Sequence, residues 1–265
     1  YRAALIKIGQ FPKRRKPESV FADIDIKGRF PSYDTLHDDI NKYQLSLYNP
    51  SRYVREEFKA LYEEKKVRNF SQANREDFLI GMMRVNFLKR LESSVRSFAI
   101  TMDRTIERIE LLEKRLMDFR IHAAMEAELI DGELFVDETD DDEELADLFQ
   151  VGKALKFEMA HLRVDDWLKA LKADKQRLAL LHGVAKEVTA DRDAKLVELK
   201  KIIEKKVRQP STNIHGEEIR KIIVFCAFAD TASYLYEEME EWARKKLSVH
   251  IALVSGGAKP NRATF

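Results

Sequence analysis

The sequence predicts a mainly α fold, in which a bundle or hairpin of long helices is followed by an incomplete α/β unit of the βαβ type. Three observations predict this class. Nine glycines and six prolines in 265 residues are about half of average usage, so few tight turns interrupt the chain. Charged residues make up 35%, as is typical of long solvated helices. Apolar residues recur at steps of three and four through the middle of the chain, as on one face of a helix.

We interpret residues 1–35 as a linker that contains one strand. They hold three of the six prolines and a basic cluster at residues 13–16. In residues 20–26, β-branched and aromatic side chains alternate with Asp, which predicts a strand that ends at Gly28. No partner strand is expected in its own neighbourhood.

Residues 36–208 are expected to form the helical bundle, with helices that open at Pro50 and Ser71. One apolar seam resembles that of a coiled coil, and a second seam could pair with it antiparallel. The first seam contains Leu88, Leu91, Val95, Phe98, Met102, Thr105, Ile109, Leu112, Leu116 and Phe119. The second contains Trp167, Leu171, Asp174, Leu178, Leu181, Ala185 and Val188, and a third follows through Leu196, Leu199, Ile203 and Val207.

An acidic run at residues 137–144 separates the first two seams. Its charges repel one another, and Asp is a poor helix former. We therefore interpret it as a solvated loop, rather than as a magnesium site or a mimic that binds a basic partner.

Residues 209–265 change composition after a short polar linker. Residues 221–226 form an apolar run typical of a buried parallel strand, residues 230–246 predict a helix, and residues 249–254 predict a second strand. A lone βαβ unit cannot cover both faces of its sheet. We therefore expect that the chain stops inside a domain, or that this unit packs against another structural unit.

Composition excludes several function classes. A single cysteine excludes a disulfide framework and a cysteine-based zinc site. The net charge of +1 does not by itself suggest a nucleic-acid or membrane partner. No apolar run approaches the roughly 20 residues that cross a bilayer, so we expect no membrane partner and a cytoplasmic location.

Several short motifs are interpreted as structural. No two glycines stand five apart, so a phosphate loop is absent and we expect no nucleotide hydrolysis by this chain alone. The Asp137-Glu138 pair follows an apolar run, as does the Asp-Glu pair that binds magnesium in nucleotide-hydrolysing enzymes. We interpret this match as a coincidence. Glu158 and His161 have metal-ligand spacing, but no second such pair exists, so we expect no metal. Cys226 is expected to be buried filler, not a nucleophile.

Two segments carry a resemblance to a known family. Residues 221–257 resemble the opening of the second RecA-like lobe of superfamily-two helicases, with Val-Phe-x-x-Phe-x-Asp-Thr similar to their motif IV. Residues 83–94, which include Lys-Arg-Leu-Glu-Ser-Ser, resemble a helix of bacterial Swi/Snf-class helicases, the double-stranded-DNA translocases. Residues 11–14 look like the exit from the first lobe of that class.

The resemblance implies a non-catalytic fragment of such an ATP-dependent helicase. Residues 1–35 would leave the first lobe, residues 36–208 would be a helical insertion, and residues 209–265 would be the truncated start of the second lobe. ATP and Mg²⁺ would bind in the parent protein, and this fragment would hold no cofactor. The implied partners are double-stranded DNA and the first lobe of the same polypeptide.

Candidate nucleic-acid-binding residues follow from the same resemblance. Motif IV and the loop after the second strand face the nucleic acid backbone in the family, which implicates Phe228, Thr231, Ser255 and Gly256. Lys89 and Arg90 lie in the signature helix and either contact DNA phosphates or brace the lobes. The alternative is a helical scaffold or regulator that binds partners through its seams.

Overall fold

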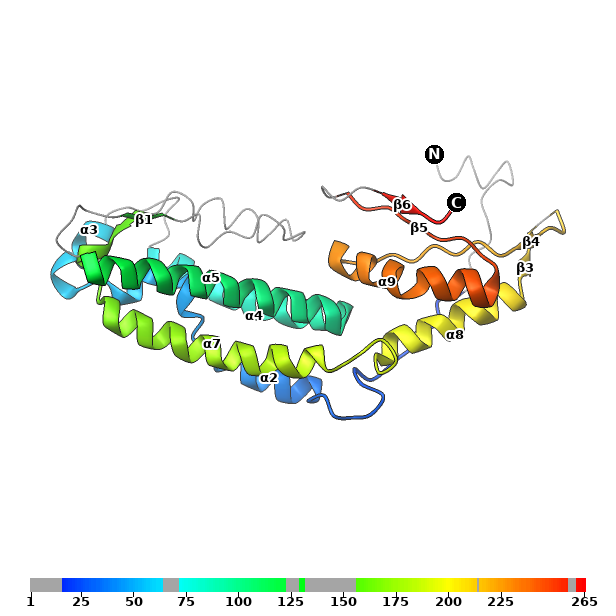
Figure 1. Cartoon of the computed structure of the whole chain (residues 1–265), viewed down its shortest axis with the longest axis horizontal. Helices are drawn as coiled ribbons and strands as arrows, with labels where there is room; N and C mark the ends of the chain where they lie inside the picture. Colours follow the sequence, from blue (N-terminus) through cyan, green and yellow to red (C-terminus); the bar gives the residue numbers. More distant parts are fainter. Residues whose placement is uncertain (1–15, 64–71, 123–128, 132–155, 214, 257–260) are drawn as a thin grey trace.

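Long helices make up most of the described chain and give it an elongated shape (Figure 1). The computed structural model describes residues 16–63, 72–122, 129–131, 156–213, 215–256 and 261–265. Its mainly α character agrees with the sequence prediction. The acidic run at residues 137–144, the Asp137-Glu138 pair and residues 11–14 lie outside the described residues.

Three long helices form the bundle, namely α4 (Gln72–Ser93), α5 (Val95–His122) and α7 (Val164–Lys186). The predicted antiparallel pairing of α5 with α7 is confirmed by two polar side-chain contacts between them. Arg120 near the end of α5 pairs with Asp165 at the start of α7, at 3.2 Å, whereas Asp103 lies 3.7 Å from His182 near the end of α7.

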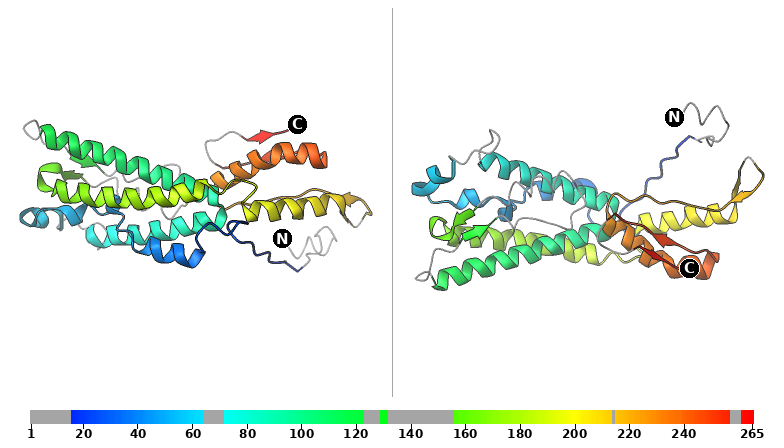
Figure 2. Two further views of the ribbon diagram at one scale, coloured as in Figure 1. Left: turned by 60° about the horizontal axis from the view of Figure 1, so that its bottom comes forward. Right: turned by 90° about the horizontal axis from the view of Figure 1, so that it is seen from above.

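The predicted seams supply the core of the bundle. Every member of the second seam is buried, and so is every member of the first except its ends, Leu88 and Phe119, which are half-buried. The first seam does not lie on one helix, however. Ser94 separates α4 from α5, and the two helices lie side by side and diverge from this point (Figures 1 and 2).

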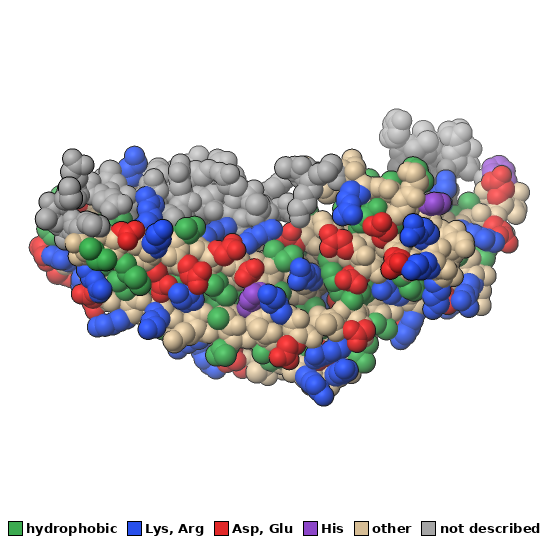
Figure 3. Space-filling view, in the orientation of Figure 1, with side chains coloured by type: hydrophobic (Ala, Val, Ile, Leu, Met, Phe, Trp, Pro, Cys, Tyr) green, Lys and Arg blue, Asp and Glu red, His purple; other side chains and the backbone are tan. Residues whose placement is uncertain are grey.

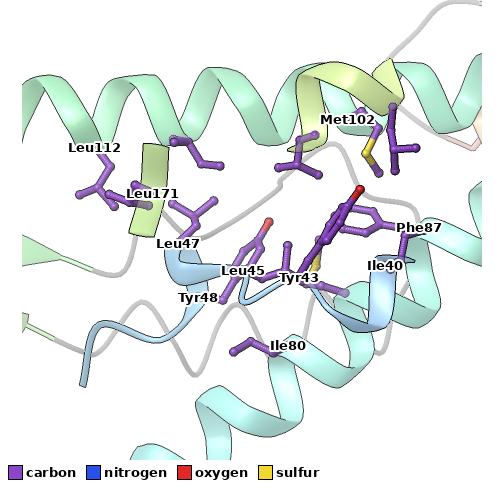
Figure 4. Packing of buried hydrophobic residues seen from close by; sticks show 14 of the residues in the cluster. Ile40, Tyr43, Leu45, Leu47, Tyr48, Ile80, Phe87, Met102, Leu112 and Leu171 are labelled. Atoms are coloured by element: carbon purple, nitrogen blue, oxygen red, sulfur yellow. The ribbon is translucent and has the colours of Figure 1, made fainter. Parts of the chain in front are cut away.

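A buried polar member of the second seam has a structural role. Asp174 is 1% exposed and accepts a hydrogen bond from the backbone amide of Ser46 at 2.7 Å. The indole of Trp167 donates to the Ser46 carbonyl at 2.7 Å. These bonds fix the short helix η1 (Ser46–Tyr48), whose preceding residue, Leu45, adopts a left-handed φ of 50°. The burial of the Leu45 side chain in the core offsets the strain of this backbone conformation (Figure 4).

Shorter elements close the rest of the bundle. Helix α2 (Tyr33–Asn41) is capped by Ser32, whose Oγ accepts from the amide of Thr35 at 3.2 Å. The helix expected at Pro50 is a single 3-10 turn, η2 (Pro50–Tyr53), whereas the helix expected at Ser71 begins at Gln72 as α4. The remaining elements are η3 (Glu56–Phe58), α3 (Lys59–Glu63), the antiparallel strands β1 (Leu129–Asp131) and β2 (Lys156–Glu158), and η5 (Met159–His161).

The C-terminal part contains α8 (Ala194–Arg208) and α9 (Ala229–Trp242), which continues as the π-helix η6 (Ala243–Leu247). This confirms the helix predicted at residues 230–246. A second hydrophobic cluster, built around Leu196, Tyr234 and Met239, joins α8 to α9. The strands here are β3 (Ser211–Thr212) with β4 (Glu218–Ile219) and β5 (Ala252–Leu253) with β6 (Arg262–Ala263), both pairs antiparallel.

Two strand predictions are wrong. Residues 20–26 form a single bridge, between Asp25 and Asp193. Residues 221–226 form no strand, and Ile223 and Phe225 within them are 78% and 91% exposed. The physical reason is the same for both, since β structure requires a neighbouring strand and no described segment supplies one.

The expected βαβ unit is therefore incomplete in its hydrogen bonding. No described strands pair in parallel, and the strand predicted at residues 249–254 is present only at Ala252–Leu253. The segments before and after α9 do run in the same direction along it (Figure 1). The chain thus follows the path of a βαβ unit, but the two segments are not joined by the hydrogen bonds of a parallel strand pair.

Candidate functional site at the α4–α5 junction

The junction between α4 and α5 is a continuous turn of backbone hydrogen bonds. The Ser94 amide donates to the Arg90 carbonyl at 2.9 Å, and the Phe98 amide donates to the Ser94 carbonyl at 3.1 Å. The Ser94 hydroxyl accepts from the amide of Ser97 at 3.0 Å and so caps α5. The signature segment Lys-Arg-Leu-Glu-Ser-Ser thus occupies the point where the two helices meet.

Arg90 extends from this junction to the first turn of α9. Its Nη1 lies 3.2 Å from Oδ2 of Asp230, and the two side chains are 1% and 7% exposed. Arg104 of α5 reaches the same carboxylate with two bonds, of 3.0 and 3.3 Å, but its side chain is 25% exposed. One carboxylate at the start of α9 therefore holds two guanidinium groups from the bundle.

The aromatic residue of the motif IV-like segment completes this contact. Phe228 is the residue before α9, and its ring centroid lies 4.0 Å from Cζ of Arg90. It is 6% exposed, so the guanidinium is stacked on the ring in a site shielded from water. Such a cation–π contact is favourable mainly when the partners are desolvated.

Hydroxyl groups form the other side of the junction. The Thr231 hydroxyl lies 2.7 Å from that of Ser93 and 3.0 Å from that of Ser94. Thr231 is 4% exposed. These bonds join the C-terminus of α4 to the first turn of α9, beside the Arg90–Asp230 pair.

The structure thus brings together four of the six residues implicated from the sequence: Arg90, Phe228 and Thr231 in direct contact within the cluster, and Lys89 beside it. Lys89 lines an open pocket of about 420 Å³ together with Phe228 and Thr231. Cys226 also lines this pocket and is half-buried, not fully buried as expected. Its partial burial raises the pKa of the thiol, which disfavours the reactive thiolate.

Ser255 and Gly256 are not part of this cluster. They follow β5, and the backbone amide of Ser255 donates to the Asn261 side chain at 3.2 Å. Strand β5 runs toward the end of α9 at which the cluster lies (Figure 1), so the two groups share one end of that helix.

The Glu158–His161 pair is engaged in local contacts. His161 Nε2 lies 3.3 Å from Glu158, and its Nδ1 lies 2.8 Å from the hydroxyl of Tyr62. Phe58 stacks on the imidazole at a centroid distance of 3.9 Å. Across the described part of the chain, no group of three or more His, Cys, Asp or Glu side chains has metal-site geometry.

A second charged cluster was missed in the sequence. The carboxylate of Asp25 receives Arg192 Nε at 3.0 Å and Nη2 at 2.5 Å, and it also accepts from the backbone amides of Arg29 and Phe30. The Arg192 hydrogen bonds hold the pKa of Asp25 well below its ordinary value. No local pattern signals this pair, because its members are 167 residues apart.

The neighbouring Asp193 extends this cluster to α9. One carboxylate oxygen caps α8 by accepting from the amide of Leu196 at 3.0 Å, and the other accepts from the Tyr234 hydroxyl at 3.0 Å. Burial, reinforced by the charge of Asp193, raises the pKa of Tyr234. Adjacent residues in the turn between α7 and α8 therefore hold the N-terminal segment on one side and α9 on the other.

None of the helices in the described ranges has the length and apolar composition of a membrane span. Comparison with family models, with curated proteins and with solved structures finds no match to this chain.

Proposed function

We propose that this chain is the helical-insertion and motif IV segment of an ATP-dependent double-stranded-DNA translocase of the Swi/Snf class. The proposal rests on one observation. The two segments that carry the resemblance lie about 140 residues apart in sequence, yet Arg90, Ser93 and Ser94 of one contact Phe228, Asp230 and Thr231 of the other.

Within this proposal, Arg90 has a bracing role. Its guanidinium is buried against a carboxylate and an aromatic ring, so it is turned away from solvent and from any phosphate backbone. Lys89 is exposed and lines the neighbouring pocket, where a phosphate can approach. ATP binding and hydrolysis would close and open the lobes. The contact between Arg90 and Asp230 would transmit the resulting movement of the second lobe to the bundle.

The test is ATP hydrolysis by the full gene product with and without duplex DNA. We expect stimulation by duplex DNA, and we expect a phosphate loop and an Asp-Glu box to be encoded before residue 1. Arg90→Met should lower the stimulated rate more than the basal rate, because it removes the brace without opening a large cavity. Lys114→Met, at an exposed position on α5, is the charge-matched control.

The opposite result would favour a helical scaffold. A gene product without a phosphate loop and without DNA-stimulated hydrolysis would overturn the translocase proposal. Equal effects of Arg90→Met and Lys114→Met on the stimulated rate would show that the Arg90 contact has no part in coupling the lobes to the bundle.

A further inference from the structure

A second pocket lies on the bundle, far from the α4–α5 junction, between η1, η2 and the exposed side of α7. Its volume is about 410 Å³. Gln44 and Tyr53 contribute to its wall, and its charged lining residues are Arg52, Arg163, Lys169, Arg177, Asp166 and Asp174. Figure 3 shows Lys and Arg side chains at the lower left, in the region of the first turns of α7.

The two carboxylates neutralise little of this positive charge. Asp174 is 1% exposed and its Oδ2 is bound to the amide of Ser46. Asp166 lies 3.6 Å from Nη1 of Arg163, which accounts for one cation. Three exposed cations remain, and within the described ranges no hydrogen bond or ion pair engages the side chains of Arg52, Lys169 and Arg177.

The floor of the pocket is suited to a close approach. Ala170 and Ala173 lie on the surface of α7 between the cations of its first turns and Arg177. Their small side chains leave room for a ligand to reach the helix. Lys169 and Arg177 are eight residues apart, which is about 12 Å along the helix axis. Measured along the duplex axis, one DNA strand presents three or four phosphates over about this distance.

We propose that this pocket, here called the α7 basic pocket, binds the phosphate backbone of duplex DNA. The cluster itself points to phosphate groups, because several unneutralised Lys and Arg side chains converge on a concave surface. The choice of duplex DNA as the source of those phosphates rests on the proposed function. The bundle then carries its own DNA contact, which is separate from the brace at α9.

The test measures affinity for a fluorescent 20-base-pair duplex by anisotropy, at several salt concentrations, with the 265-residue chain. The variant combines Arg52→Ala, Lys169→Ala and Arg177→Ala. Each phosphate contact contributes about 0.9 to the slope of log affinity against log salt. Loss of three contacts should therefore reduce the slope by about 3 and weaken binding at least about tenfold at 0.1 M salt.

The matched control removes three exposed lysines outside the pocket, by Lys186→Ala, Lys201→Ala and Lys205→Ala. It changes the net charge equally and should leave the slope nearly unchanged. A second pocket variant with Gln at the same three positions preserves side-chain length. Thermal melting followed by circular dichroism checks that both pocket variants and the control retain the fold.

Three outcomes would overturn the inference. One is equal loss of affinity in the pocket and control variants, and another is unchanged binding by the pocket variants. The third is binding of inorganic phosphate or single-stranded DNA as tight as that of the duplex, since either would give the pocket another ligand. Failure here leaves DNA-stimulated hydrolysis by the full gene product intact, whereas failure of the proposed function abolishes it.

Discussion

Removal of one carboxylate tests the brace between the bundle and α9 most directly. In Asp230→Ala, the guanidinium of Arg90 stays buried, at 1% exposure, but loses its ion pair with the Asp230 carboxylate. Breaking a buried ion pair in this way costs about 3–5 kcal/mol. Arg104, which is 25% exposed, regains water when Asp230 is lost, so its contribution to the cost is small.

The expected cost is large enough to measure by urea unfolding. With a slope of about 2 kcal/mol per molar urea, the midpoint should fall by about 1.5–2.5 M. The fluorescence of Trp242 on α9 reports this transition once the only other tryptophan, Trp167, is replaced by Phe in all proteins compared. Far-UV circular dichroism gives the transition of the bundle in the same samples.

Two controls distinguish the buried pair from a general effect of charge. Arg104→Ala should cost no more than about 1 kcal/mol, because that cation is partly solvated. Arg90→Met in the Asp230→Ala background should recover part of the loss, since an apolar side chain then fills the site. A cost below about 1 kcal/mol for Asp230→Ala, or no recovery with Met, would refute the reasoning.

Three further predictions concern the rest of the fold. Asp25→Asn should lower the melting temperature at pH 7, and its effect should shrink progressively as the pH falls below 3.8. The pKa of Asp25 is depressed in the folded protein, so its pair with Arg192 contributes its full stabilisation above the ordinary pKa of 3.8 and loses it only as the pH falls toward the lower pKa of the folded protein. Tyr234→Phe should cost about 1.5–3 kcal/mol in urea unfolding, because its hydroxyl donates to the charged Asp193, and an unchanged midpoint would contradict this. Leu171→Ala, at a fully buried seam position, should cost about 2–5 kcal/mol, and a smaller loss would mean that the bundle collapses around the cavity.

The bundle could be predicted from the sequence because its information is local. A helical seam recurs every three or four residues, so Trp167 and Leu171 identify their own buried face without knowledge of their partners. The break at Ser94 was missed because seam residues continue on both sides of it. Nothing in the periodicity distinguishes one straight helix from two that share a corner.

Pairing between distant residues could not be predicted in the same way. Arg90, Phe228 and Thr231 were each singled out, but their mutual contact depends on how the bundle meets α9. For the same reason, the sequence does not distinguish Arg104 from the other charged residues of α5. The apolar run at residues 221–226 has the composition of a buried strand, yet composition alone cannot supply the neighbouring strand on which its hydrogen bonds depend.

The sharp corner at Ser94 has a mechanical consequence. Helix α5 has 28 residues and is therefore about 42 Å long, with Arg104 in its first half bonded to the start of α9. If the helix tilts as a rigid rod about that corner, each degree moves its far end by about 0.7 Å. A tilt of ten degrees, which displaces the atoms beside Ser94 very little, would sweep the opposite tip of the bundle through about 7 Å.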